Sequence, residues 1–153
     1  MRIGIPVAVL SVLFVFAASE PAKAAIDKMQ PDAQSLAALE ARAAVAQPRE
    51  QCYLYAELVH EMIEFSSAQY AAGEIEKAAN TLKQVNAFAQ KIHLGISNDG
   101  KKIKNAQILL RHTAFRLTEL LHSSSLEDRP LVEVTLSQVN QIQTETMMQV
   151  FRK

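Results

Sequence analysis

Apolar residues recur every three or four positions along most of the chain, which is the spacing of amphipathic helices. The pattern predicts helices over about 33–47, 48–72, 74–94, 101–123 and 126–151. Asp32 can cap the first of them. Residues 131–136 are β-branched enough for a strand, but no second strand is available to pair with it, so a helix is favoured. Ser124 and Glu127 have the spacing of a capping box before the last helix.

The chain is expected to reverse direction at Gly73. On a helical wheel at about 100° per residue, the apolar stripes of 48–72 and 74–94 lie on opposite sides, so one straight helix would leave one stripe in water. Glycine suits the left-handed position that ends many helices. The predicted fold is therefore all-α: an up-down helical bundle of four to five helices with short connections, in a single domain over 32–153. The helix 33–47 is expected to pack outside it.

The segment from Gly73 to Ala78, with Leu82 and Val85 after it, resembles the second half of a tetratricopeptide repeat. The resemblance covers about a dozen residues of one hairpin, and no 34-residue period recurs. It implies a helical hairpin with the same glycine turn, and no peptide-groove function is carried across.

The N-terminal segment 1–24 has the features of a cleaved signal peptide. Arg2 precedes an apolar run over 3–18, and Ala22-Lys23-Ala24 offers a cleavage site before Ala25. That run is shorter than the roughly 20 residues needed to span a bilayer. We expect a flexible leader over 25–31, no stable membrane insertion after cleavage, and an extracytoplasmic location, periplasmic or secreted.

Charge is balanced overall but unevenly distributed. The chain has 16 basic and 16 acidic residues, and removal of segment 1–24 takes away two basic and one acidic residue, which leaves a net charge of −1. This balance argues against nucleic acid as a partner. Segment 25–80 holds nine acidic and four basic groups, whereas 81–126 holds seven basic and two acidic. Attraction between neighbouring helices is favoured over a basic face for an acidic ligand.

Cys52 is the single cysteine, so it cannot form an intramolecular disulfide. It can cross-link two chains or be buried as a small apolar residue. Burial is favoured, since free cysteine is among the most buried residue types.

Two Glu-x-x-His motifs, Glu57 to His60 and Glu119 to His122, have the spacing found in di-metal helical bundles. Both lie on the wheel away from the apolar stripes of their helices. If each helix packs against the next, residue 58 is level with about 88 and about 106, which leaves the motifs roughly 20 Å apart. Metal ions of such centres are about 3.5–4 Å apart. No metal or cofactor is therefore expected; the four residues are candidates only in another topology.

Ile108 and Phe115 lie opposite the main apolar stripe of helix 101–123, and His112 and Glu119 flank them. Either the first or the last helix covers this strip, or it is an exposed apolar face for a protein partner. Coverage is favoured, because five helices give helix 101–123 two neighbouring sides to bury.

No coherent catalytic set is present, so the chain is not expected to be an enzyme. The leading hypothesis is a small exported helical protein that binds other proteins, as an envelope-stress or chaperone-like module, with self-association also possible. The alternative is a metal- or haem-binding bundle that uses His60, His112 or His122 with nearby Glu.

Overall fold

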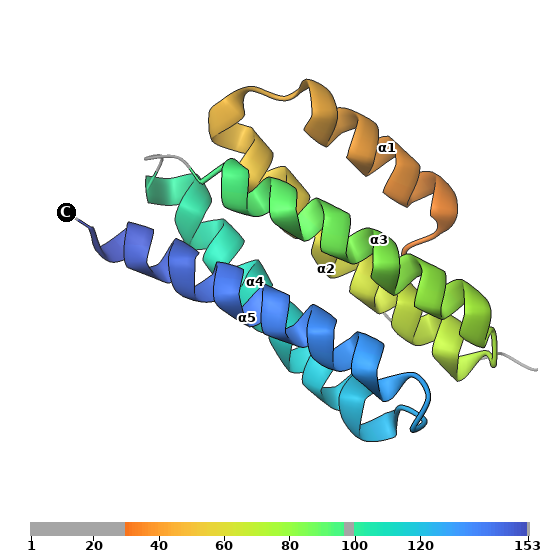
Figure 1. Cartoon of the computed structure of the whole chain (residues 1–153). Helices are drawn as coiled ribbons and strands as arrows, with labels where there is room; N and C mark the ends of the chain where they lie inside the picture. The colour runs from red at the N-terminus through yellow and green to blue at the C-terminus, as the bar shows by residue number, and fades with distance from the viewer. Residues whose placement is uncertain (1–29, 97–99, 153) are drawn as a thin grey trace, which may run out of the picture.

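The computed structural model describes residues 30–96 and 100–152, which are almost entirely helical (Figure 1). The helices are α1 (Ala33–Val45), α2 (Pro48–Ala71), α3 (Ile75–Leu94), α4 (Gly100–Ser123) and α5 (Arg129–Phe151). The described residues contain no strand, so the all-α prediction is confirmed and residues 131–136 are helical. The predicted signal peptide and residues 25–29 of the predicted leader lie outside the described residues.

Capping and proline residues set the helix starts. The Asp32 carboxylate accepts a hydrogen bond from the Ser35 backbone N–H at 2.7 Å, and the Ser35 hydroxyl accepts one from the Asp32 N–H at 3.0 Å. Such reciprocal bonds satisfy N–H groups that a helix start otherwise leaves without partners. Pro48 is the first residue of α2, a position where the missing N–H of proline has no intrahelical acceptor to lose.

The start of α5 differs from the prediction. The Ser124 hydroxyl donates a hydrogen bond to the Leu120 carbonyl of α4 at 2.6 Å, and α5 begins at Arg129. The expected capping box of Ser124 and Glu127 is therefore wrong. A helix starting there would place Pro130 in its interior, where proline removes a backbone hydrogen bond and clashes with the preceding turn.

The reversal at Gly73 is confirmed. Gly73 has a φ of 77°, in the left-handed region. Its N–H bonds the Tyr70 carbonyl at 3.0 Å, and the Glu74 N–H bonds the Gln69 carbonyl at 2.9 Å. These two bonds form a Schellman motif, which ends α2 and lets α3 fold back along it.

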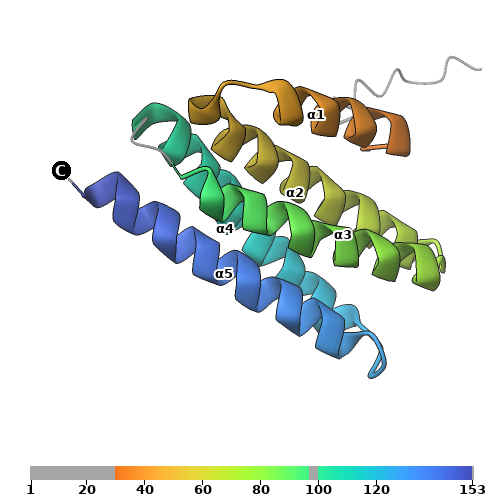
Figure 2. The ribbon, with the colours of Figure 1, turned by 45° about the horizontal axis from the view of Figure 1, so that its top comes forward.

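Two antiparallel hairpins, α2–α3 and α4–α5, lie side by side (Figure 1). α2 contacts α4 and α3 contacts α5, whereas no contact joins α3 to α4 or α2 to α5 in the described residues. Glu50, at the start of α2, pairs with Lys102 at the start of α4, and Glu64 pairs with Arg116 further along both helices. α2 and α4 therefore run in the same direction. Figure 2 shows the same parallel course for α3 and α5.

This arrangement corrects one expectation. Helix direction does alternate along the chain, but α4 packs on α2 and not on α3, so residue 58 is level with about 110 of α4 and not with 106. The hydrophobic pattern could not decide between the two neighbours, because both arrangements bury the same stripes. Ion pairs between acidic α2 and basic α4 accompany the observed choice.

The two hairpins bury equivalent positions. Val59 of α2 and Leu110 of α4 are both buried. When α2 is shifted along the sequence so that Val59 falls on Leu110, every other residue of α4 that is described as buried also falls on a buried residue of α2. A similar constant offset, the one that takes Leu82 to Val132, relates four buried residues of α5 to buried residues of α3. The second hairpin thus repeats the packing of the first one, although the side chains themselves differ.

α1 packs outside the two hairpins, as expected, and within the described residues its backbone approaches that of α2 alone. α2 is therefore the central helix, with α1, α3 and α4 around it. Its buried residues include Cys52, Leu58 and Ile63. The predicted burial of Cys52 is confirmed.

Substitution of Gly73 by Ala should destabilise the fold by about 1 kcal/mol, because an L side chain at positive φ costs about 1–2 kcal/mol and the loss of chain entropy offsets only part of it. A Cβ at this position would meet nothing within 4 Å, so the cost is one of backbone conformation alone. Urea unfolding measures it. Gly73→Asn is the matched variant and should lose less, since Asn tolerates the left-handed region better; equal stability of all three proteins would contradict the argument.

Candidate functional site

α4 turns two large apolar side chains to solvent. Ile108 is 44% and Phe115 63% exposed. They stand two helical turns apart, which is about 10 Å along one side of the helix. Leu110 and Leu117 lie on the opposite side and are fully buried. We call the set Ile108, His112, Phe115 and Glu119 the α4 face.

The expected coverage of this strip is wrong. In the described residues, the backbone of α1 approaches that of α2 and not that of α4, and α5 packs on both α4 and α3. α4 therefore has two neighbours, α2 and α5, and both pack against its buried stripe. The side of α4 opposite that stripe, with exposed His112 and Glu119, stays open in the described structure.

Arg116 fixes one end of the α4 face. Its Nε and Nη2 donate to the two carboxylate oxygens of Glu64 on α2, at 2.7 and 3.0 Å, and its Nη1 pairs with Glu119. Hydrogen bonds to Glu64 and Glu119 raise the pKa of Arg116 above its usual value. The Glu119 carboxylate is therefore held at the edge of the face by a fixed positive charge.

The unevenly distributed charges form ion pairs between neighbouring helices, which is the interpretation favoured from the sequence. Glu50 and Glu64 of α2 pair with Lys102 and Arg116 of α4. Other basic side chains of α4, at Lys104, Arg111 and His112, are exposed on its outward side. The α4 face is thus apolar in the middle, and basic groups predominate around it.

The equivalence of the two hairpins gives this surface a structural meaning. On α2, His60 and Glu64 touch α4 through Thr113 and Arg116. At the constant offset of the buried positions, these two α2 residues correspond to Arg111 and Phe115. Phe115 therefore corresponds to a position of α2 that packs on α4, whereas Ile108 corresponds to Glu57, which pairs with Arg42 of α1.

Further apolar side chains of α5 are exposed, at Met147, Met148 and Phe151. Met147 is 40% exposed although it continues the apolar stripe of Val139 and Ile142. Because α5 runs antiparallel to α4, its C-terminal end lies beside the N-terminal half of α4 (Figure 1). Sequence reasoning did not single these residues out.

The two Glu-x-x-His motifs do not converge. Glu57 pairs with Arg42 of α1 at 2.9 Å, His60 faces Thr113, and His122 is exposed at the end of α4. Since α2 and α4 are parallel, Glu119 is level with about residue 67, which puts the motifs about 15 Å apart along the helices, less than the distance expected from the sequence. The described residues hold no group of three or more His, Cys, Asp or Glu that could bind a metal ion.

His60 forms a polar contact between helices. The buried Thr113 hydroxyl donates to the Leu109 carbonyl at 2.9 Å. Its only proton is then used, so the His60 Nδ1–H donates to the Thr113 oxygen at 3.1 Å. This contact fixes the His60 tautomer and the level of α2 against α4.

Cys52 lies at the start of α2, beside the end of α3. A Cβ at Gly95 would lie 3.5 Å from the Cys52 backbone nitrogen, an ordinary contact distance, so the start of α2 packs against the end of α3. Burial raises the pKa of the Cys52 thiol to about 11. The thiol is therefore protonated at neutral pH and is a poor nucleophile or metal ligand.

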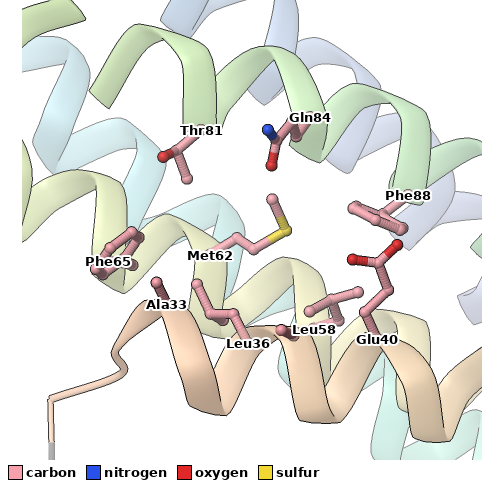
Figure 3. A pocket seen from close by; sticks show the side chains of 10 residues that line it. Ala33, Leu36, Glu40, Leu58, Met62, Phe65, Thr81, Gln84 and Phe88 are labelled. Atoms are coloured by element: carbon pink, nitrogen blue, oxygen red, sulfur yellow. The ribbon is translucent and has the colours of Figure 1, made fainter. Parts of the chain in front are cut away.

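A half-open groove of about 220 Å³ lies between α1, α2 and α3 (Figure 3). Its apolar lining includes Leu36, Leu58, Met62, Phe65 and Phe88, and its polar lining is Glu40, Thr81 and Gln84. Figure 3 shows the Glu40 side chain reaching from α1 toward Phe88 of α3. No His or Cys is among the residues that line this groove.

Over the described part of the chain, every helix is too short or too polar to cross a membrane. Comparisons with protein-family models, with curated proteins and with solved structures found no match.

Replacement of Thr113 by Val should destabilise the protein by about 1 kcal/mol, because the His60 N–H loses its acceptor inside the α2–α4 contact while the shape of the side chain is kept. Thr118→Val is the matched control, since Thr118 is an exposed α4 residue whose hydroxyl bonds only its own helix, at the Ala114 carbonyl. Thermal unfolding at pH 8 compares the two. Equal losses would show that the contact between the helices contributes nothing.

In the native protein at pH 8, the Cys52 thiol should react with an aromatic disulfide reagent about 100-fold more slowly than in denaturant, because it is buried and protonated. The pKa in the fold, about 11, lies above the ordinary 9.0. The buried, protonated Cys52 thiol therefore contributes its full stability to the fold below pH 9, and this contribution is lost as the pH rises toward 11. Between pH 8 and pH 10.5, urea unfolding should therefore show a smaller loss of stability for Cys52→Ala than for the parent protein. A Cys52 thiol that reacts as fast in the native protein as in denaturant would refute the burial argument.

Proposed function

We propose that this protein is a non-enzymatic, exported binding module that holds a protein partner on the α4 face. The observation that carries the proposal is the exposure of Ile108 and Phe115 on the helix side opposite a complete buried stripe. Single exposed apolar residues are ordinary on protein surfaces. Two of them aligned on one helix, with charges around them, are typical of a helix that packs on both sides.

The equivalence of the hairpins supports the same proposal. In arrays of stacked helical hairpins, the last unit normally presents a polar outer surface to water. α4 departs from that rule at Ile108 and Phe115, and Phe115 corresponds to Glu64, a residue of α2 that binds α4. A helix of a partner protein would occupy the place that α4 occupies on α2.

Export remains part of the proposal through the signal-like segment 1–24. The alternative, metal or haem binding by His60, His112 or His122, has no observation in the described residues that favours it. His112 and His122 are separated by about 15 Å along α4, and His60 bonds Thr113.

A photo-cross-linking amino acid at position 112 tests this function in the cells that produce the protein. We expect one discrete protein adduct, because His112 lies between Ile108 and Phe115, and we expect Phe115→Ser in the same chain to reduce the adduct at least about tenfold, as loss of a central apolar anchor does. The same probe at Thr144, an exposed residue of α5, is the positional control. An adduct of equal strength at both positions, or none at 112, would refute the binding role of the α4 face.

A further inference from the structure

Opposite charges stand at equal distances from a central pair of apolar side chains along α4. Lys104 stands one helical turn before Ile108, and Glu119 stands one turn after Phe115. On a helical wheel these four residues lie within an arc of about 60°. Arg111 and His112 lie between them, on either flank of that arc. Followed from one end to the other, this side of α4 therefore presents a positive charge, two apolar side chains and a negative charge.

We propose that the partner of the α4 face is a second copy of this chain, whose α4 lies antiparallel to the first across a two-fold axis between residues 111 and 112. The proposal rests on the function proposed above and names its partner. Residues equally distant from the axis lie opposite each other in this dimer. Ile108 then faces Phe115 of the second copy and Lys104 faces Glu119 of the second copy, and the symmetry makes each contact twice.

The charges select this arrangement over a parallel one. In a parallel pair, Lys104 would meet the other Lys104 and Glu119 the other Glu119, so both ends would repel. The antiparallel pair converts both repulsions into attractions with the same apolar contacts between them. A self-complementary surface of this kind is what a two-fold dimer requires.

The structure holds Glu119 ready for such a contact. Arg116 binds Glu119 on one side and the Glu64 carboxylate of α2 on the other, so the Glu119 side chain is already partly ordered. It is still 48% exposed, which leaves carboxylate surface open to a lysine. Pre-ordering reduces the entropy that association costs.

Two features set the expected strength. Met147 and Phe151 of α5 add exposed apolar area at the level of the N-terminal half of α4. Against this, the two Arg111 side chains meet near the axis. A contact formed largely by one helix from each copy is small, so we expect a reversible dimer with a dissociation constant of about 10–100 µM.

Sedimentation velocity between about 5 and 500 µM tests the assembly, with protein expressed from the full-length sequence and purified in the form that the cell produces. A monomer–dimer equilibrium is expected, and Ile108→Ser or Phe115→Ser should weaken it at least about tenfold. Val45→Ser is the matched control, because Val45 is an 85% exposed apolar residue of α1, away from α4. A monomer at every concentration, open-ended polymers, or a dimer that tolerates Phe115→Ser would overturn the proposal.

A charge-reversal cycle tests the pairing. Lys104→Glu and Glu119→Lys should each weaken the dimer about tenfold, because each places like charges opposite each other twice. The double variant should recover the parent affinity to within about threefold. Thermal unfolding of each variant accompanies the cycle, since Glu119 also binds Arg116, whereas Lys104→Glu leaves that pair intact. A double variant as weak as the single ones would exclude this register.

Cysteine cross-linking tests the symmetry, and the buried native Cys52 leaves the background low. His112→Cys, beside the axis, should form a disulfide with itself under mild oxidation. Lys104→Cys should not, because the two copies of residue 104 would be about 22 Å apart. Mixing Lys104→Cys with Glu119→Cys should give the mixed disulfide. Self-linkage at 104 as fast as at 112 would refute the two-fold axis.

The outcomes separate the two proposals. If the probe at position 112 captures a different protein while the purified chain stays monomeric, the binding function stands and the dimer proposal fails. If the adduct is a dimer of this chain and the charge-reversal cycle restores affinity, both stand. If neither an adduct nor a dimer forms, the α4 face has no binding role and both fail.

Discussion

Two apolar stripes that a continuous helix would place on opposite sides must reach one core, and the left-handed conformation of Gly73 makes this possible. The turn ends α2 with two defined backbone hydrogen bonds and sends α3 back along it. The packing of α3 along α2 follows from that reversal. α2 becomes the central helix, and its remaining sides are left for α1 and α4.

The second organising constraint is the contact between α2 and α4. Ion pairs at Glu50 and Glu64 and the hydrogen bond between His60 and Thr113 join the two helices along their length. Surface ion pairs contribute little stability singly, about 0–1 kcal/mol, yet they distinguish one neighbour from another when the apolar burial is equal. The result is two hairpins side by side.

The α4 face is exposed because no further helix packs on it within the described residues. In the first hairpin, α2 is covered by α4; in the second, the corresponding side of α4 has no further hairpin on it in the described chain. The spacing of Ile108 and Phe115, and the charges flanking them, were visible in the sequence. Their exposure was not, because it depends on where α1 packs: α1 covers α2 on the far side of the molecule from α4 (Figure 2).

What the sequence determined by itself is local. Asp32, Pro48 and Gly73 act within one helix turn, and the three- and four-residue spacing of apolar residues defines each buried stripe, so helix positions and the reversal followed from neighbouring residues alone. The start of α5 is an exception. Although Ser124 and Glu127 have capping-box spacing, the helix begins later, at Arg129, because Pro130 is tolerated in the first turn of a helix and not in its interior.

Only the tertiary structure decided which helices are neighbours. An amphipathic helix specifies that a stripe is buried but not against what, because apolar burial has no direction. The levels of Glu57 and Glu119, the burial of Thr113 and the openness of the α4 face all depend on the parallel course of α2 and α4. That course arises from contacts between residues far apart in the chain, which no local pattern contains.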